Sequence, residues 1–141
     1  MKFEKIDITK ENINPFQRIG QDWMLISAER EGKVNTMTAS WGMMGVFWGK
    51  NVVTVGIRPQ RFTKEFVDAG EFFTLTFFDG ERKEEMGYLG KVSGRDEDKF
   101  AKADIKWEDA TYVDAPILTD CPVSIECSVV DSTMPGTHEL F

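Results

Sequence analysis

Residues 23–41 read WMLISAEREGKVNTMTASW, and this stretch predicts how the chain begins to fold. Apolar residues dominate the short run from Trp23 to Ala28, and the Glu31-Gly32 pair that follows is a turn signal. From Val34 to Trp41 the side chains alternate between two faces, as they do in a β-strand. The two runs and the turn between them predict an antiparallel hairpin.

Period-two patterns recur in three further segments. They are Asn51 to Arg58 (NVVTVGIR), Phe72 to Phe78 (FFTLTFF) and Val123 to Val130 (VSIECSVV). In each segment the large apolar side chains share one face. Thr74 and Thr76 are expected on the opposite face of the second segment, and Ser124, Glu126 and Ser128 are expected to face outward in the third. Short strands separated by turn signals predict a mainly β domain, built as an antiparallel barrel or sandwich.

Two short helices are expected among these strands. Gln60 to Ala69 carries apolar residues at helical spacing and is expected to end with a left-handed cap at Gly70. Asp96 to Ala103 is the second, with Asp96 as its N-cap and Phe100 facing inward. Residues 1–141 are therefore predicted to form a single domain with helical insertions.

Charge is distributed unevenly along the chain, which carries a formal net charge of −7. Residues 1–70 have a net charge of +2 and residues 71–141 a net charge of −9. The acidic second half disfavours nucleic acid as a partner. No apolar run approaches the roughly 18 residues that span a bilayer, so we expect no membrane segment and a cytoplasmic location.

Common catalytic signatures are absent from the sequence. It contains no G-x-G-x-x-G, no phosphate loop and no nucleophile elbow. His138 is the sole histidine and no Cys-x-x-Cys pair occurs, so no protein-bound metal is expected. Cys121 and Cys127 lie about 20 Å apart along an extended chain, which predicts two reduced thiols rather than a mutual disulfide.

The positive signal is a cluster of cationic and hydroxyl residues where a strand ends and a helix begins. It consists of Arg58, Arg61, Thr63 and Lys64, with Pro59 breaking the strand. A helix N-terminus and arginine side chains suit a phosphate group, whereas a solvated helix start is the alternative.

A second polar row, Thr36, Thr38 and Ser40, lies on one face of the Val34–Trp41 strand. It is either the solvent side of a sheet or a further wall of the same site. The run WGMMGVFW from Trp41 to Trp48 is too apolar for a solvated connection. We therefore expect a buried loop there, covered by a second subunit or a ligand.

Taken together, these motifs resemble the flavin reductase-like family of FMN-binding split barrels, which includes flavoredoxins and ferric reductases. The resemblance spans about residues 14–141. It rests on N-T-M-T-A-S-W from Asn35 to Trp41, R-P-x-R-F-T from Arg58 to Thr63, S-G-R-D-x-D-K-F from Ser93 to Phe100, A-P-I-L from Ala115 to Leu118, C-P-V-S-I-E-C from Cys121 to Cys127, and the terminal G-T-H-E-L-F.

The resemblance implies a six-stranded antiparallel Greek-key split barrel with short helical insertions, paired as a homodimer with FMN at the subunit interface. It also implies two groups of cofactor-binding residues. Those lining the flavin ring and ribityl chain would be Asn35, Met37, Thr38, Ala39, Ser40 and Trp41; those holding the phosphate end would be Arg58, Arg61, Phe62 and Thr63. His138 matches a position near the flavin, where it either contacts nicotinamide or has a structural role.

The implied reaction takes electrons from NAD(P)H through flavin to free flavin, ferric iron or a protein, with no nucleophilic side chain required. Two alternatives remain: a flavoredoxin-type carrier without its own NAD(P)H oxidation, and a non-enzymatic dimeric barrel. Family members usually continue past G-T-H-E-L-F with at least one more strand. Because this chain stops at Phe141, we expect either a shortened closing strand or a barrel closed in another way.

Overall fold

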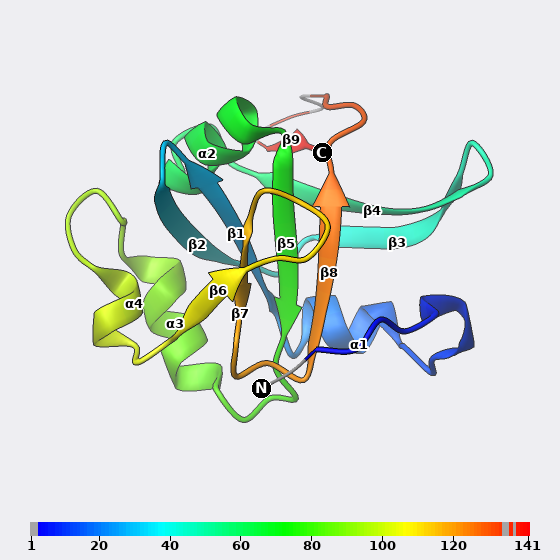
Figure 1. Ribbon diagram of the computed structural model, residues 1–141, viewed down its shortest axis with the longest axis horizontal. Coiled ribbons are helices and arrows are strands. Elements are labelled where there is room, and N and C mark those ends of the chain that lie inside the picture. Colours follow the sequence, from blue (N-terminus) through cyan, green and yellow to red (C-terminus); the bar gives the residue numbers. More distant parts are fainter. Residues whose placement is uncertain (1–2, 134–135, 137) are drawn as a thin grey trace.

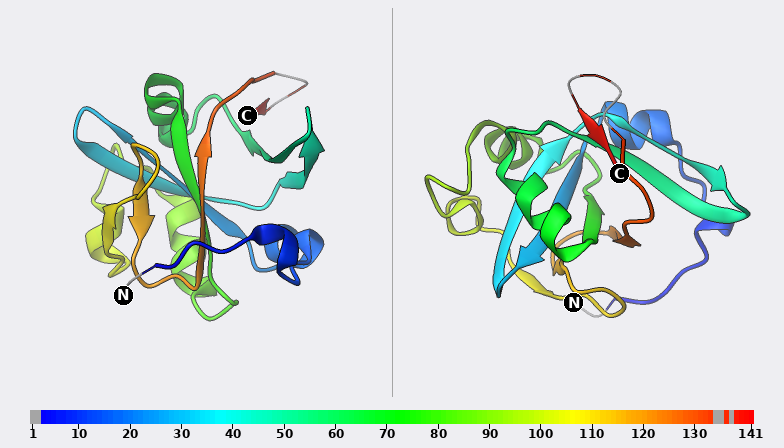
Figure 2. Two further views of the ribbon diagram at one scale, coloured as in Figure 1. Left: turned by 45° about the vertical axis from the view of Figure 1, so that its right-hand side comes forward. Right: turned by 90° about the horizontal axis from the view of Figure 1, so that it is seen from above.

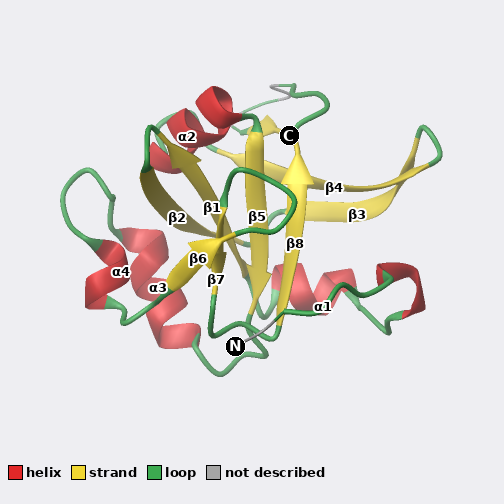
Figure 3. Cartoon of the chain, viewed as in Figure 1, coloured by secondary structure: helices red, strands yellow, loops and turns green. Residues whose placement is uncertain are grey.

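The computed structural model describes residues 3–133, 136 and 138–141. Its longer strands are β1 (Met24–Arg30), β2 (Lys33–Ala39), β3 (Gly42–Phe47), β4 (Lys50–Ile57), β5 (Phe72–Phe77) and β8 (Val123–Ser128), and its shorter ones are β6 (Trp107–Asp109), β7 (Pro116–Leu118) and β9 (Glu139–Leu140). The helices are the 3₁₀ turn η1 (Ile8–Lys10), α1 (Pro15–Gly20), α2 (Phe62–Gly70), α3 (Lys83–Lys91) and α4 (Lys99–Lys102) (Figure 1, Figure 3).

Antiparallel pairing organises the described strands into two main sheets. One has the order β2-β1-β5-β8 and the other the order β3-β4-β9, while β6 and β7 form a separate ribbon. After β2 the chain leaves for β3 and β4, then returns as β5 on the far side of β1. This mainly β architecture with short helices confirms the predicted fold class.

The first hairpin forms as the sequence predicts. Ile26 pairs with Met37 across β1 and β2, and the connecting turn places Glu31 at φ 52° and Gly32 at φ 74°. Two successive left-handed residues give the twist that joins two antiparallel strands closely. The period-two pattern and the turn signal are thus both confirmed.

The four-stranded sheet is buried on both faces, which the sequence reading did not predict. One face packs inside the barrel around Ile26, Phe73 and Leu75, together with Phe66 of α2. The other face carries a second core made of Leu25, Phe78, Met86, Leu89, Ala103, Ile105, Leu118 and Cys121. Figure 2 shows α3, α4 and the β6–β7 ribbon gathered beside this sheet.

The face of β5 opposite its large apolar side chains is therefore buried and is not a solvent face. Thr74 and Thr76 are fully buried, and Thr74 Oγ1 donates to Pro116 O at 2.6 Å. On β8, the Glu126 carboxylate accepts the backbone N–H of Tyr112 at 2.6 Å. The β6–β7 ribbon and its connecting segment cover these polar residues. Successive side chains of these strands therefore face two different buried cores, and not a core on one side and solvent on the other.

Helix boundaries also differ from the prediction. The left-handed cap of α2 is Glu71, at φ 60°, and not Gly70. The second predicted helix is shorter, because Asp98 and not Asp96 is its N-cap, accepting from the N–H of Ala101. Phe100 packs inward as expected. The pattern gave no indication of α1 or α3.

The apolar run from Trp41 to Trp48 is a strand rather than a buried loop. It forms β3, whose hairpin with β4 projects from the body of the protein (Figure 1). Val46 is 71% exposed and Trp48 66% exposed. An apolar groove of about 670 Å³ runs between this hairpin, β8 and the segment around η1. The expected cover is not supplied by this chain's own described residues.

Both cysteines are free thiols, as predicted. Burial raises the pKa of Cys121 and of Cys127 to about 12, so neither is a reactive thiolate near neutral pH. No helix among the described residues has the length and apolar character to cross a bilayer.

Packing of α3 against the outer face of the sheet is testable by truncating Leu89, which is fully buried. Leu89→Ala should lower the free energy of unfolding by about 2–5 kcal/mol, because it leaves a cavity in the second core. Urea denaturation at fixed protein concentration measures the loss. The exposed Glu84→Gln on the same helix should change stability by about 0.5 kcal/mol or less. Equal, small effects of the two substitutions would show that α3 does not pack there.

Candidate functional site

The junction between β4 and α2 presents an uncapped helix start. β4 ends at Ile57, Pro59 interrupts the extended chain, and α2 begins at Phe62. Arg61 is the N-cap residue, and its side chain makes no capping hydrogen bond. The first N–H groups of the helix, those of Phe62 and Thr63, therefore have no acceptor within the helix, and the helix dipole adds positive potential around them.

Arg58 and Arg61 add two guanidinium groups to this helix start. Among residues 3–133, 136 and 138–141, neither forms an ion pair with a carboxylate. Burial, and next the positive charge of Arg58, lower the pKa of Arg61, which shows that the two cations repel one another. An anion bound between them and the helix start would relieve this repulsion.

His138 connects Arg58 to Trp41. Arg58 Nε donates to His138 Nε2 at 3.1 Å, and the imidazole lies 4.5 Å from the Trp41 ring, centroid to centroid. Trp41 is 60% exposed, so its ring offers an aromatic surface at the edge of the cationic cluster. The structure thus joins three of the predicted site residues in one contact chain.

The hydroxyl row on β2 is not a solvent face, because α3 covers it. Thr36 is fully buried and its Oγ1 donates to Ile26 O at 3.2 Å. Thr38 Oγ1 donates to Met86 O of α3 at 2.5 Å. Ser40, just beyond the end of β2, is half-buried. Of the three residues, Thr38 and Ser40 lie nearest the C-terminal end of β2.

Asn35 and Thr63 are bonded to each other beneath the cationic cluster. Asn35 Nδ2 donates to Thr63 Oγ1 at 2.8 Å, and both side chains are at least 95% buried. Phe62 lies over Phe66 edge to face, with the Arg95 guanidinium 4.6 Å from its ring centroid. The hydrogen bond between Asn35 and Thr63 connects β2 to α2. Direct contact of either side chain with a cofactor stays a prediction.

Met37 and Ala39 point into the barrel core, so they offer only backbone groups to a ligand. In the described part of the chain β2 pairs with β1 alone and forms an edge of its sheet. An edge strand has a row of N–H and C=O groups that no neighbouring strand uses. Such groups can hydrogen-bond the polar edge of a flat heterocycle.

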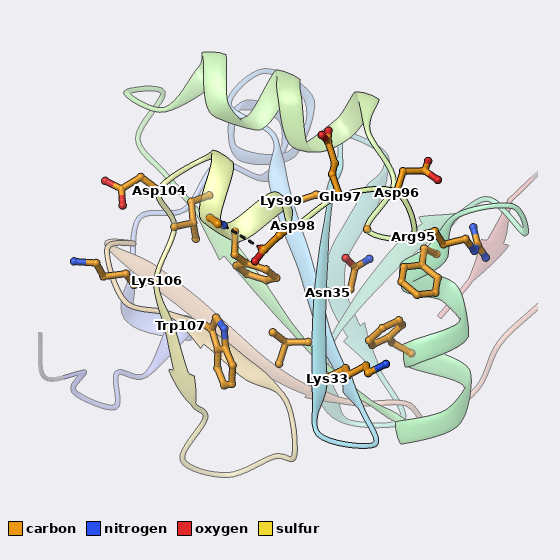
Figure 4. A pocket seen from close by; sticks show the side chains of 17 residues that line it. Lys33, Asn35, Arg95, Asp96, Glu97, Asp98, Lys99, Asp104, Lys106 and Trp107 are labelled. Carbon is orange, nitrogen blue, oxygen red and sulfur yellow. Dashed lines mark hydrogen bonds between the residues drawn. The ribbon is translucent and has the colours of Figure 1, made fainter.

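A cavity of about 960 Å³ lies beside this cluster, between the β1–β2 hairpin, α2 and residues 94–107. Figure 4 shows Asn35 and Lys33 on one wall and the acidic residues 96–98 on another. Its lining includes Phe62 but neither Arg58 nor Arg61. The charge around this cavity is mixed, because its lining includes four carboxylates and four cations, Lys33, Arg95, Lys99 and Lys106. A phosphate group is better accommodated by the arginine cluster, where no carboxylate of the described chain pairs with Arg58 or Arg61.

Two residues that the sequence did not single out, Gly90 and Lys99, contact the elements around the arginine cluster. Arg61 Nη1 donates to Gly90 O at 2.9 Å, near the end of α3, and Lys99 Nζ donates to two carbonyls of the same turn. The sequence of α3, KEEMGYLGK, contains two glycines and mixed charges, which obscure its helical pattern. Lys99 is part of the S-G-R-D-x-D-K-F motif, but the motif alone does not predict which groups this lysine contacts.

The chain is similar to known proteins in sequence and in fold. Residues 16–141 match the family described as the flavin reductase like domain. A flavoredoxin from Methanosarcina acetivorans is 26% identical, with a TM-score of 0.75 over 99% of this chain and 71% of that one. An FMN-binding protein from Thermus thermophilus is 22% identical, with a TM-score of 0.76 over 100% of this chain and 75% of that one.

The chain belongs to the flavin reductase-like family. Proteins of this family bind flavin and are typically dimeric. An uncharacterized protein from Aeropyrum pernix is 27% identical over 119 residues, which cover 84% of this chain and 45% of that protein. The chain thus spans about half the length of that curated relative, and 61% of a second one, from Archaeoglobus fulgidus.

The bond between Asn35 and Thr63 predicts a specific pattern of stability changes. Thr63→Val should cost about 1–3 kcal/mol in free energy of unfolding, because it leaves a buried amide without its acceptor. Replacing both partners, as Asn35→Leu with Thr63→Val, should cost less than the sum of the two single changes. Urea unfolding of the four proteins measures the coupling. Strictly additive losses would show that the two side chains do not depend on each other.

Proposed function

We propose that this chain binds FMN, with the phosphate group at the start of α2 and the flavin ring near the end of β2. The observation that carries the proposal is a pair of arginines without carboxylate partners in the described chain, set at a helix N-terminus that no side chain caps. A phosphate monoester carries about −2 charge and accepts several hydrogen bonds, which matches what these groups lack.

The residues present fit the rest of the cofactor as well. The exposed ring of Trp41 offers an aromatic neighbour for the flavin, and the open edge of β2 offers backbone donors and acceptors. Thr38, whose hydroxyl donates to Met86 O, and the half-buried Ser40 lie toward the end of β2, where we expect their hydroxyl groups to be close to the flavin. FMN is proposed in place of FAD because solved structures with the same fold include FMN-binding proteins.

The bound flavin would accept a hydride from NAD(P)H and pass electrons on to free flavin, ferric iron or a protein. This chain's own contribution is binding and orientation: the arginines hold the phosphate end, and His138 keeps Arg58 beside Trp41. In this proposal no side chain acts as a nucleophile or as a general acid. The protein sets the position and the electrostatic surroundings of the flavin.

A homodimer is part of the proposal. The groove beside the β3–β4 hairpin is lined by apolar residues, and the hairpin itself exposes Met43, Val46, Phe47 and Trp48. Apolar surface gathered in this way is typical of a protein interface. The sequence indicated that either a second subunit or a ligand covers this segment. We propose the second subunit, which would bring its own residues to the flavin.

Loss of either arginine should weaken FMN binding. Arg58→Ala and Arg61→Ala should each cost about 1–3 kcal/mol of binding free energy, because each removes a charge-assisted contact with the phosphate. Quenching of FMN fluorescence during titration of flavin-free protein measures the dissociation constant. Arg18→Ala, far from the cluster and paired with Asp79, is the matched control and should leave it unchanged. Unchanged affinity in both cluster variants would remove them from the site.

The similarity to a flavoredoxin supports a second candidate, an electron carrier with the same flavin site but no NAD(P)H oxidation of its own. Steady-state oxidation of NADH and NADPH by FMN-loaded protein separates the two. A reductase should turn over either nucleotide with excess FMN or ferric iron as acceptor. Flavin that binds stoichiometrically but is reduced only by an electron-transfer protein would identify the carrier. Failure of FMN to bind would leave a non-enzymatic barrel.

A further inference from the structure

Lys99 is a buried cation close to the proposed phosphate site. It is the first residue of α4, and only 3% of its surface is exposed. Its Nζ donates to Leu89 O at 2.9 Å and to Val92 O at 3.1 Å. These carbonyls lie at the end of α3, where the helix dipole is negative and a cation is stabilised.

Arg61 is held by the same turn of α3. Its Nη1 donates to Gly90 O, the carbonyl next in sequence to that of Leu89. Two cations from different helices, one from the N-cap of α2 and one from α4, therefore bind adjacent carbonyl groups. The buried Lys99 and the half-buried Arg61 are therefore held at the same end of α3.

The charge of Lys99 has no carboxylate partner in the described chain. Glu97 is the nearest acidic group that acts on it, but that carboxylate already pairs with Lys102 and accepts the hydroxyl of Tyr88. Asp98 caps the backbone of α4. From α2 the group that acts on Lys99 is Arg61, which is cationic and repels it.

We propose that Lys99 is the buried third cation of the phosphate site, and that FMN binding is coupled to the uptake of a proton by this lysine. The inference rests on the proposed FMN site. Arg58, Arg61 and Lys99 bring three positive charges to this region. Neutral carbonyls of α3 hold Arg61 and Lys99, and His138 holds Arg58, so no carboxylate in the described chain neutralises them. A dianionic phosphate beside Arg61 supplies the missing negative charge and stabilises the ammonium form of Lys99.

The direction of the pH dependence follows from the environment of the free protein. Burial, and next the charge of Arg61, lower the pKa of Lys99 to about 8. Above this pH the free protein loses the proton, and binding of the anion requires that it be regained. FMN affinity is therefore full below about pH 8 and falls as the pH rises through it. The raised thiol pKa values of Cys121 and Cys127, about 12, keep them out of this range.

Deprotonation of Lys99 changes its charge and not its hydrogen bonds. A neutral amine retains two N–H donors, which is enough for Leu89 O and Val92 O. The end of α3 thus stays in place while the electrostatic contribution is lost. This distinguishes a cation that acts on the phosphate from a lysine that only anchors the helix.

The test compares FMN affinity at pH 7.5 and pH 9.5 by fluorescence titration. The affinity of the unmodified protein should fall by about sixfold between these pH values if bound phosphate raises the pKa of the lysine by about one unit. Lys99→Met should bind more weakly at pH 7.5 and lose this fall, whereas Lys99→Arg, which stays charged, should bind tightly at both pH values. Lys106→Met, an exposed lysine nearby, is the control and should behave as the unmodified protein does. Any ionisation of FMN itself is common to all four proteins.

Calorimetry of the unmodified protein gives a second measurement that needs no variant. At pH 8.5, FMN binding in two buffers of different ionisation enthalpy should reveal uptake of about half a proton per FMN. Tight binding without proton uptake, or with the same pH dependence in Lys99→Met, would overturn the role of Lys99 and leave the FMN site intact. Absence of FMN binding at pH 7.5 in the unmodified protein would overturn the FMN site itself.

Discussion

The last turns of α3 anchor the candidate site, because their carbonyl groups bind side chains from three other elements. Met86 O accepts from Thr38 of β2, Gly90 O accepts from Arg61 at the start of α2, and Leu89 O accepts from Lys99 of α4. Helix C-termini have carbonyls without intrahelical partners and a partial negative charge. A single helix end thus fixes a cation, a hydroxyl group and a buried ammonium group relative to one another.

This arrangement explains why cations remain available for an anion. A neutral carbonyl accepts a hydrogen bond from one nitrogen of Arg61, and the imidazole of His138 accepts one from Arg58. Both side chains are therefore held in position by groups that do not neutralise their positive charge. Pairing with a carboxylate would fix the side chains equally well but would cancel the field that attracts phosphate. The site is preorganised and still positively charged.

The two-sided burial of the central sheet makes this geometry possible. The segment between β5 and β8, residues 78–122, covers the outer face with α3, α4 and the β6–β7 ribbon. Leu89 packs in that outer core, while carbonyls of the same turn accept hydrogen bonds from Arg61 and Lys99. Packing of the second core therefore sets the position of α3, and through it the distance between β2 and the start of α2.

Several features followed from the sequence alone: the β1–β2 hairpin, the antiparallel fold class and the cationic junction at Arg58 and Arg61, because each depends on neighbouring residues with a clear period or turn chemistry. The resemblance to flavin reductase-like proteins added the family. Only the tertiary structure decided that Thr36 and Thr74 are buried, that Glu71 caps α2, and that Lys99 and Arg61 bind adjacent carbonyls of α3. Burial of the second face of the sheet and contacts between residues far apart in sequence do not produce a periodic sequence pattern. They depend on how distant segments pack against each other in the folded chain.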